Sequence, residues 1–372
     1  MPLPTDHYTA TIECDPVRAL AQWRQWCEDG AQTGPFQTTP WLTAWYTTLG
    51  TTPGVQPLLA SIRRRGDERL MMALPLLLHR NGRLRRIEFA DLGVTDYVAP
   101  LLTPDCPLQP QQIRAMFAAL RRALPRADLF RVHKCAATIG ALANPMLQLS
   151  GMRPSTLNGN LVTIGEDFDA WRSTLPKPHR KGMERAWRVF SRHDNATFRL
   201  AKDADDATRL LQDLESQQRV NIAKKGWPYL LDQPGYPDFY RRLLADGLHD
   251  GTTVLSALTA EGETVAALLG IRRGDYYAML RVGSSVERWR HCSPGRLVME
   301  RTLAALHRDG VRRFDLTIGN YPYKKAFLPE RLPLYELDLP LSWKGLPFAA
   351  AHQLKSRLRP LVKGRRRGEQ DD

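Results

Sequence analysis

The stretch TTVLSALTAEGETVAALLGIRRGDYYAMLRVG, residues 252–283, decides the fold that we expect for the second half of the chain. It holds three apolar runs of strand length, separated by Glu261–Gly262 and by Gly274–Asp275. Short glycine-containing turns join antiparallel neighbours, so the stretch predicts three consecutive antiparallel strands. A helix is expected next, over SPGRLVMERTLAALHRDG, with Pro294 in its first turn and Gly310 at its end.

The stretch RRFDLTIGNYPYKKAF, residues 312–327, follows that helix. Residues 311–319 predict a strand, and a loop free of helix is expected after it. Asp315 lies on this strand, and Tyr323 and Lys324 come shortly after its end. Two interpretations stay open here: a solvated basic loop, or a strand end that presents polar groups for chemistry.

The chain divides into two parts with a similar order of elements. Residues 1–155 predict two helices, a meander of apolar strands, a further helix and a last strand. Residues 156–340 follow a related order without a residue-level repeat. The length of 372 residues also exceeds one ordinary domain of about 100–200 residues. We therefore predict an α/β (α+β) protein of two related domains, 1–155 and 156–340, each a mixed, mostly antiparallel sheet flanked by helices, and a basic amphipathic tail over 341–372.

Composition limits the partners and the compartment. The formal net charge is +14 and the pI is near 9.8, so the surface attracts anions such as nucleic acid, acidic membranes, phosphorylated substrates or coenzymes. The five cysteines are scattered and the nine histidines form no HExxH pattern, which predicts neither a disulfide framework nor a metal site. No secretory signal and no uncharged apolar run of about 18 residues occurs, which indicates a cytoplasmic protein.

The signatures of several enzyme classes are missing from the sequence. The patterns GxxxxGK[ST], GxGxxG after a strand and GxSxG do not occur. Nucleotide hydrolysis, dinucleotide-dependent redox chemistry and serine hydrolysis therefore lose their usual support.

Basic residues gather in two places of the second part. In ERWRHCSPGRL, residues 287–297, the expected helix start lies among Arg288, Arg290, Gly295 and Arg296. Unpaired N–H groups at a helix start let a pyrophosphate approach closely, although an ordinary cap with solvated arginines is an equal alternative. The expected helix 177–193 carries a basic face that either is solvated or clamps an anionic substrate, formed by Lys181, Arg185, Arg188 and Arg192.

Three kinds of side chain suit transfer to a carbonyl carbon. A lysine such as Lys324 can stabilise a developing oxyanion, and Tyr323 beside it can position the reacting group or relay a proton. Glu215, on an expected long helix, is a carboxylate that can take a proton from an attacking amine or hydroxyl.

Taken together, these motifs resemble the acetyltransferase domain of the CelD/BcsL group, a branch of the GNAT superfamily named for cellulose biosynthesis. The resemblance rests on Glu215 before AKKGW, on LTAEGETVAALLG, on YYAMLRVGSSVERWRHCSPGRL and on FDLTIGNYPYKKAF, in this order over about residues 160–330. PFQTTPWLTAW, MALPLLL and LGVTDYVAPLL resemble the N-terminal half of the same group. One departure concerns the GNAT phosphate loop [RQ]xxGx[GA], because RHCSPG keeps an arginine and one glycine of it.

The resemblance implies two GNAT-like domains and direct transfer of an acyl group, acetyl above all, from acyl-CoA to an amine or hydroxyl of a sugar in cell-surface polysaccharide. Its implied catalytic residues are Lys324, Tyr323, Glu215 and Asp315. Those for the acetyl-CoA donor are Arg288, Arg290, His291, Ser293, Gly295 and Arg296. Those for the acceptor are Arg281, Lys181, Arg185, Asp96 and Tyr97.

Two other functions stay open. Fem-type ligases, which pair two GNAT-like domains and end in a similar aromatic-lysine motif, take their donor from charged tRNA, and the charge of +14 suits tRNA as a partner. A non-catalytic scaffold of a polysaccharide synthase would instead use the tail, where eight Lys and Arg residues lie between Lys344 and Arg367. Next to Trp343, Leu346 and Phe348 they either dock residues 341–367 on acidic inner-membrane lipid or remain idle surface charge.

Overall fold

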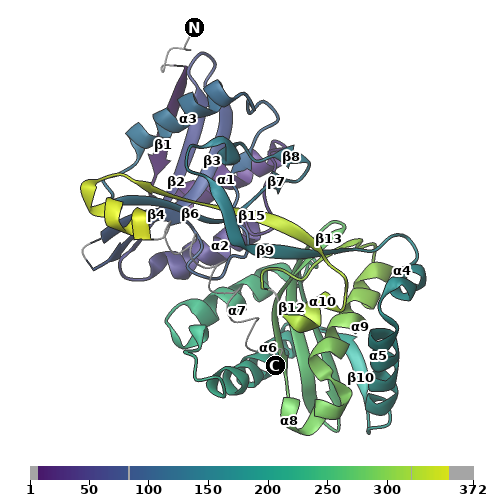
Figure 1. Cartoon of the computed structure of the whole chain (residues 1–372). Helices are drawn as coiled ribbons and strands as arrows, with labels where there is room; N and C mark the ends of the chain where they lie inside the picture. The colour runs from purple at the N-terminus through teal and green to yellow at the C-terminus, as the bar shows by residue number, and fades with distance from the viewer. Residues whose placement is uncertain (1–6, 83, 320, 352–372) are drawn as a thin grey trace, which may run out of the picture. The chain divides into compact units, whose positions relative to one another are not determined.

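The computed structural model describes residues 7–82, 84–319 and 321–351. The chain forms two compact units, one from residues 1–157 and 333–372 and the other from residues 158–332 (Figure 1). The predicted class is confirmed, because each unit is a mixed, mostly antiparallel sheet with helices packed against it. Most of the expected basic tail, from residue 352 onward, lies outside the described residues. Within the described residues, no helix has the length and apolarity needed to cross a membrane.

The first unit is built on sheet strands in the order β1-β2-β3-β4-β6-β15. All neighbours are antiparallel except β4 and β6. The strands are β1 (Tyr8–Glu13), β2 (Val55–Arg64), β3 (Leu70–Asn81), β4 (Leu84–Phe89), β6 (Leu129–Ala136) and β15 (Glu330–Pro340), with short β5 (Leu101–Leu102) on β3. The hairpin expected from the apolar runs is β2–β3, and the helices are α1 (Pro16–Glu28), α2 (Thr39–Thr47) and α3 (Pro110–Ala123). Short β7 (Thr138–Ile139) and β8 (Leu142–Ala143) pair separately.

The second unit has the strand order β9-β14-β13-β12-β11-β10. The quoted stretch 252–283 forms three consecutive antiparallel strands, as predicted: β11 (Thr253–Ala260), β12 (Glu263–Arg273) and β13 (Tyr276–Ser284). The outer strands are β9 (Arg153–Thr163), which enters from the first unit, β10 (Thr197–Leu200) and β14 (Arg313–Asp315). β14 runs parallel to β13 and antiparallel to β9.

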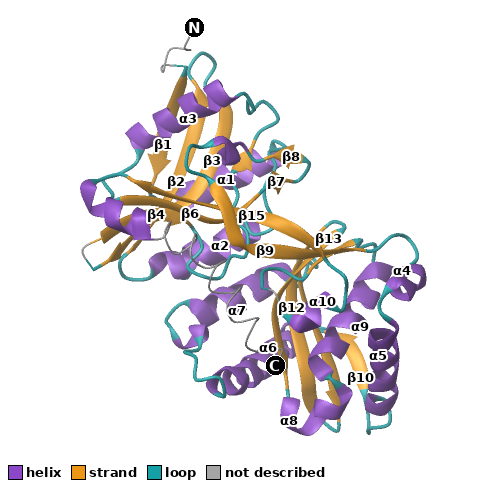
Figure 2. Cartoon of the chain, in the orientation of Figure 1, coloured by secondary structure: helices purple, strands orange, loops and turns teal. Residues whose placement is uncertain are grey.

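Helices cover both faces of this second sheet (Figure 2). On one face α5 (Lys177–Phe190) and α9 (Pro294–Arg308) pack over a core that includes Phe190, Leu268 and Leu303. On the other face lie α6 (Ala204–Ala223) and α7 (Tyr236–Gly247), whose buried leucines face β11 and β12. The remaining short helices are α4 (Phe168–Thr174), α8 (Val286–Trp289) and α10 (Pro322–Lys325).

Two expectations for the stretch after α9 are wrong. The strand is three residues long rather than nine, and the loop after it contains the one-turn helix α10. The reason is local, because the Asp315 carboxylate accepts a hydrogen bond from the backbone N–H of Thr317 at 2.6 Å. Thr317 has φ +61°, a left-handed conformation that takes the chain out of the strand.

A β-bulge in β13 decides where Arg281 points. Met279 pairs with Gly270 and Arg281 pairs with Leu269, so Leu280 is an extra residue on β13. Met279 and Val282 both join the core under α5 and α9. Regular alternation would place Arg281 on the same face as Met279, and the inserted residue turns it to the α6 face instead.

Gly283 lets α6 lie close against the end of β13. A Cβ atom at this position would be 2.8 Å from the backbone oxygen of Leu214. Backbone cannot move aside as a flexible side chain does, so the contact requires glycine.

We expect Gly283→Ala to lower the free energy of unfolding by about 1–3 kcal/mol, because the new methyl group pushes α6 away from the sheet. Gly182→Ala is the matched control: Gly182 lies on the exposed side of α5 with no atom near its Cβ position, so alanine should stabilise by about 0.5–1 kcal/mol. Urea unfolding of both variants measures the two changes, and equal effects would contradict the close approach of α6.

Candidate active site

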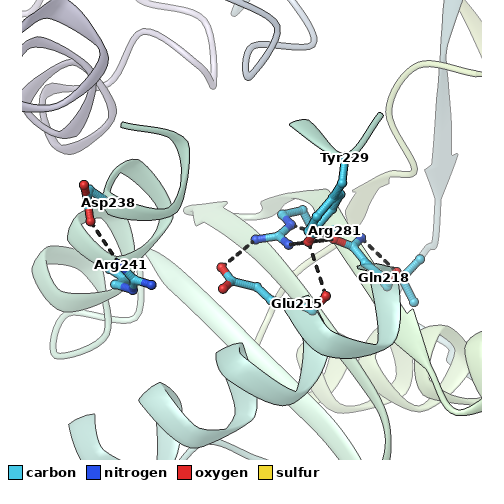
Figure 3. A network of polar contacts seen from close by, with 7 residues as sticks. Glu215, Gln218, Tyr229, Asp238, Arg241 and Arg281 are labelled. Atoms are coloured by element: carbon cyan, nitrogen blue, oxygen red, sulfur yellow. Dashed lines mark hydrogen bonds and ion pairs between the residues drawn. The ribbon is translucent and has the colours of Figure 1, made fainter. Parts of the chain in front are cut away.

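A buried arginine organises the centre of the second unit (Figure 3). The Arg281 side chain is 5% exposed. Its Nε and Nη2 atoms donate to Gln218 Oε1 at 3.0 and 2.6 Å, and Nη2 also donates to the Tyr229 hydroxyl at 2.7 Å. The guanidinium lies over the ring of Tyr240, with its carbon 4.5 Å from the ring centroid. The contacts spread over three sides of the guanidinium, which fixes its orientation.

Glu215 completes this network. One of its carboxylate oxygens lies 3.3 Å from Arg281 Nη1, and its side chain is 17% exposed. Glu215 and Gln218 are one helical turn apart on α6, so the helix presents both to the same guanidinium. Glu215 and Arg281 are separate candidates in the sequence, and the structure brings them together.

The Glu215 carboxylate also borders a cavity of about 220 Å³ between α6 and α7. Its lining is mostly apolar, from Ala207, Leu211, Leu244, Ala245 and Leu248. Arg241, which also lines it, is paired with Asp238 at 2.9 Å (Figure 3). A carboxylate oriented by a buried cation beside an apolar pocket can accept a proton from a bound amine or hydroxyl.

Lys324 and Asp315 both fasten the turn at Thr317. Lys324 is 2% exposed, and its Nζ donates to the backbone oxygens of Ile318 at 2.6 Å and Thr317 at 3.3 Å. Asp315 is fully buried and accepts from the Tyr276 hydroxyl at 2.5 Å. The Asn160 amide donates to the Thr317 oxygen as well, at 2.7 Å. An oxyanion role for Lys324 therefore stays a prediction, because a substrate would have to compete with these carbonyls.

Tyr323 lies beside Lys324 on α10 and is half-buried. Its ring stacks on Tyr321 with centroids 5.7 Å apart. Burial raises the pKa of Tyr323 to about 12, so the phenol is neutral at physiological pH. It can donate a hydrogen bond in this state and is a poor general base.

The residues expected to hold the donor lie on the turn before α9. Ser293 has a left-handed φ of 48° and gives α9 no side-chain cap, which leaves the N-terminus of the helix open to a ligand. Arg296 Nη2 donates to Ser293 Oγ at 3.0 Å, and Arg290 and His291 are exposed. Arg288 pairs with Glu263 at 2.7 Å and with Glu261, so two carboxylates already neutralise it.

The sheet opens next to this turn. Among the described residues, β14 pairs with β13 over Tyr276–Ala278 and no further. The rest of β13, from Met279 to Ser284, pairs with β12 on its other side. Backbone N–H and C=O groups at such an open edge can pair with an extended ligand that carries amides.

Of the residues expected to contact the acceptor, two lie on another face of the second sheet and two belong to the other unit. Lys181 and Arg185 are exposed on α5, on the opposite face of the sheet from α6. Asp96 and Tyr97 belong to the first unit. Tyr97 is 3% exposed and packs edge-on against Phe36, so its ring is part of a core.

Sequence reasoning missed Gln218, Tyr229 and Asn160. The helical spacing of Gln218 from Glu215 could have signalled the first. Tyr229 follows α6 after an irregular segment and Asn160 lies on β9, so only the tertiary structure brings them to the network and to the Thr317 turn.

Comparison with known proteins bears on the enzyme class. Residues 177–325 match the family model described as acetyltransferase (GNAT) domain. The matched segment lies within the second unit. This match supports the expected acyltransferase, and the finer assignment to the CelD/BcsL group stays a prediction. No curated protein matches the chain.

Solved structures resemble the chain over both units at low sequence identity. FemX has a TM-score of 0.59 and 12% identity, covering 90% of this chain and 98% of its own. The C-terminal domain of a putative lysylphosphatidylglycerol synthetase from Agrobacterium fabrum has a TM-score of 0.54 and 11% identity. The match covers 91% of this chain and 96% of that domain. L-PGS from Bacillus licheniformis has a TM-score of 0.51 and 12% identity, and the match covers 91% of this chain and 97% of that chain. At these identities the likeness concerns the fold alone.

We expect Arg281→Lys to lower the free energy of unfolding by about 2–4 kcal/mol, because one ammonium cannot reach Glu215, Gln218 and Tyr229 together. Arg313→Lys is the control, since Arg313 pairs with Asp275 at the surface and should cost under about 1 kcal/mol. Denaturant titration measures both, and similar losses would mean that the buried network does not stabilise the unit.

Proposed function

We propose that the second unit transfers an acyl group from acyl-CoA directly to an amine or hydroxyl acceptor, within one complex of both substrates. The observation that carries the proposal is the Glu215 carboxylate, held by buried Arg281 beside an apolar pocket. It lies in the segment that matches the acetyltransferase model. Glu215 is the proposed general base, and the pocket is proposed to bind the portion of the acceptor that adjoins its attacking nitrogen or oxygen.

The proposed donor site is the uncapped N-terminus of α9 together with the open edge of β13. Coenzyme A carries a pyrophosphate and two amides on an extended arm. The pyrophosphate suits a helix N-terminus flanked by exposed Arg290 and Arg296. The amides suit the edge of β13 beyond its pairing with β14, where the Gln218 and Asn221 side chains now donate to the backbone oxygens of Val282 and Ser284. These complementary features favour acyl-CoA as the donor.

The transfer then proceeds as follows. Glu215 takes the proton of the acceptor amine or hydroxyl, whose nitrogen or oxygen attacks the thioester carbonyl carbon. Backbone N–H groups hold the resulting oxyanion, and Lys324 joins them if it exchanges its carbonyl partners, each donor contributing about 3–4 kcal/mol. The C–S bond breaks, coenzyme A leaves as a thiolate, and the neutral Tyr323 phenol stabilises it by a hydrogen bond. The new amide or ester leaves with the acyl group.

The acceptor class follows from the resemblance alone: a sugar or aminosugar of cell-surface or cellulose-type polysaccharide. The competing donor is an aminoacyl-tRNA. FemX-like architecture over 90% of the chain and a net charge of +14 favour this second candidate. Both candidates use the same carboxylate and differ in what binds at α9.

Calorimetric titration with acetyl-CoA and with desulfo-CoA separates the two donors. We expect micromolar binding of both, weakened about tenfold or more by Arg290→Ala or Arg296→Ala, since each loses a phosphate contact. Arg242→Ala is the control, because Arg242 pairs with Asp246 on α7, away from the α9 start. Absence of binding at any salt concentration, with aminoacyl-tRNA bound instead, would overturn the acyl-CoA donor.

A variant of Glu215 tests its proposed role as general base. Glu215→Gln keeps the size of the side chain, so donor binding should persist while turnover with a panel of aminosugars falls about 10²–10⁴-fold. Glu184→Gln, at an exposed carboxylate on α5, should change neither. Unchanged turnover in Glu215→Gln would remove Glu215 from the mechanism.

We also propose that residues 341–367 dock on acidic lipid at the inner membrane. Trp343, Leu346 and Phe348 are 76%, 56% and 50% exposed, next to the basic tail. Apolar side chains that insert at the headgroup boundary and cations that attract acidic lipid are the two contributions such docking needs.

Replacing Trp343, Leu346 and Phe348 together by serine should reduce pelleting with phosphatidylglycerol vesicles several-fold, because the apolar contribution is lost. Their exposure makes a folding defect unexpected. Vesicles of phosphatidylcholine are the matched control, and truncation after residue 340 should abolish pelleting at low salt. Equal pelleting of all three proteins would refute docking.

A further inference from the structure

We propose that His193, His291 and Cys292 bind a divalent zinc ion on the α5/α9 face of the second unit. One ligand atom from each of the three side chains lies within 4.8 Å of the other two. In a tetrahedral zinc site, with bonds of about 2.0 Å to nitrogen and 2.3 Å to sulfur, ligand atoms lie about 3.3–3.7 Å apart. Small side-chain rotations therefore bring the three atoms to one ion.

The hydrogen bonding of His193 suits a ligand. Its Nδ1 lies 2.7 Å from a carboxylate oxygen of Glu261. Glu261 also pairs with Arg288, so the carboxylate is ionised and can only accept, and Nδ1 must carry the proton. In the neutral ring the lone pair is then on Nε2. A carboxylate that holds one ring nitrogen while the other binds metal is the usual support of a zinc-bound histidine.

The three ligands come from segments that converge without any metal motif in the sequence. His193 follows α5, Glu261 is in the turn between β11 and β12, and His291 and Cys292 lie in the 3-10 turn Arg290–Cys292 before α9. The Trp289 ring stacks with His291 and meets His193 edge-on at 4.6 Å between centroids, which restricts both imidazoles. Pre-orientation of this kind reduces the cost of ordering the ligands.

The donor set favours zinc and leaves one position for another ligand. Two imidazoles and one thiolate combine borderline and soft donors, which suit Zn²⁺ and disfavour Mg²⁺ or Ca²⁺. His291 is exposed and Cys292 is buried, so the ion would have protein on one side and solvent on the other. Such an ion would tie the end of α5 to the turn that precedes α9. The inference does not depend on acyl-CoA being the donor.

The test uses the full chain without a histidine tag, freed of metal by a chelator. Titration with Zn²⁺ against a chromophoric indicator should give one equivalent per chain. Co²⁺ should add a thiolate-to-cobalt absorption in the near ultraviolet, which Cys292→Ser removes. Glu261→Gln should weaken zinc binding about 10–100-fold, because the support of His193 is lost.

His291→Ala is the decisive variant, because His291 is exposed and its loss should leave the fold intact. We expect it to weaken zinc binding at least tenfold, whereas His249→Ala, at another exposed histidine, should bind as the wild type does. Less than one equivalent bound by the wild-type chain, or unchanged affinity in His291→Ala, would overturn the proposal. If Cys292→Ser fails to fold, the cobalt absorption of the wild type still decides whether the thiolate is a ligand.

Discussion

The candidate site of the second unit depends on one buried guanidinium. Arg281 is 5% exposed and would be costly to bury without partners, so the groups around it have to satisfy it. Gln218, Tyr229 and Glu215 do so from α6 and from the segment after it, and Tyr240 covers its face. The same contacts that make the burial tolerable also hold the Glu215 carboxylate beside the pocket. Stability and chemistry are therefore linked through a single side chain.

β13 and β14 pair over only three residues, and the segments that follow each strand contribute to the proposed site. The helix start at Ser293 follows the end of β13, and the Thr317 turn with Lys324 follows the end of β14. The Thr317 turn therefore begins where the two strands cease to pair, at Asp315, whereas β13 continues past Ala278 to Ser284 before the chain reaches α9. A ligand along the open edge of β13 would have α9 at one end and the α6 face beside it. This arrangement agrees with a donor and an acceptor that meet across the sheet, as the proposed transfer requires.

The histidine and cysteine cluster lies between the end of α5 and the turn before α9, and it is held by different interactions. It relies on aromatic packing around Trp289 and on the Glu261 carboxylate, which Arg288 shares. Arg288, although exposed, is thereby committed to carboxylates, and Arg290 and Arg296 are exposed on the same turn. The division explains why three arginines of similar sequence setting have different expected roles. The sequence shows only that an arginine can attract anions, and the tertiary structure decides whether a carboxylate of the same chain already pairs with it.

Local sequence patterns were enough to predict the fold class, the three antiparallel strands of 252–283 and the helix that starts at Pro294, because apolar periodicity and turn residues act locally. The sequence also pointed to Glu215 as a carboxylate on a long helix and, through the family resemblance, to Arg281. Only the tertiary structure decided that the two meet, because the extra residue Leu280 reverses the face of Arg281 and no local pattern signals a bulge. The burial of Lys324, the turn at Thr317 and the approach of His193 to Cys292 likewise depend on contacts between segments far apart in the chain. Such contacts arise from packing, which sequence periodicity does not encode.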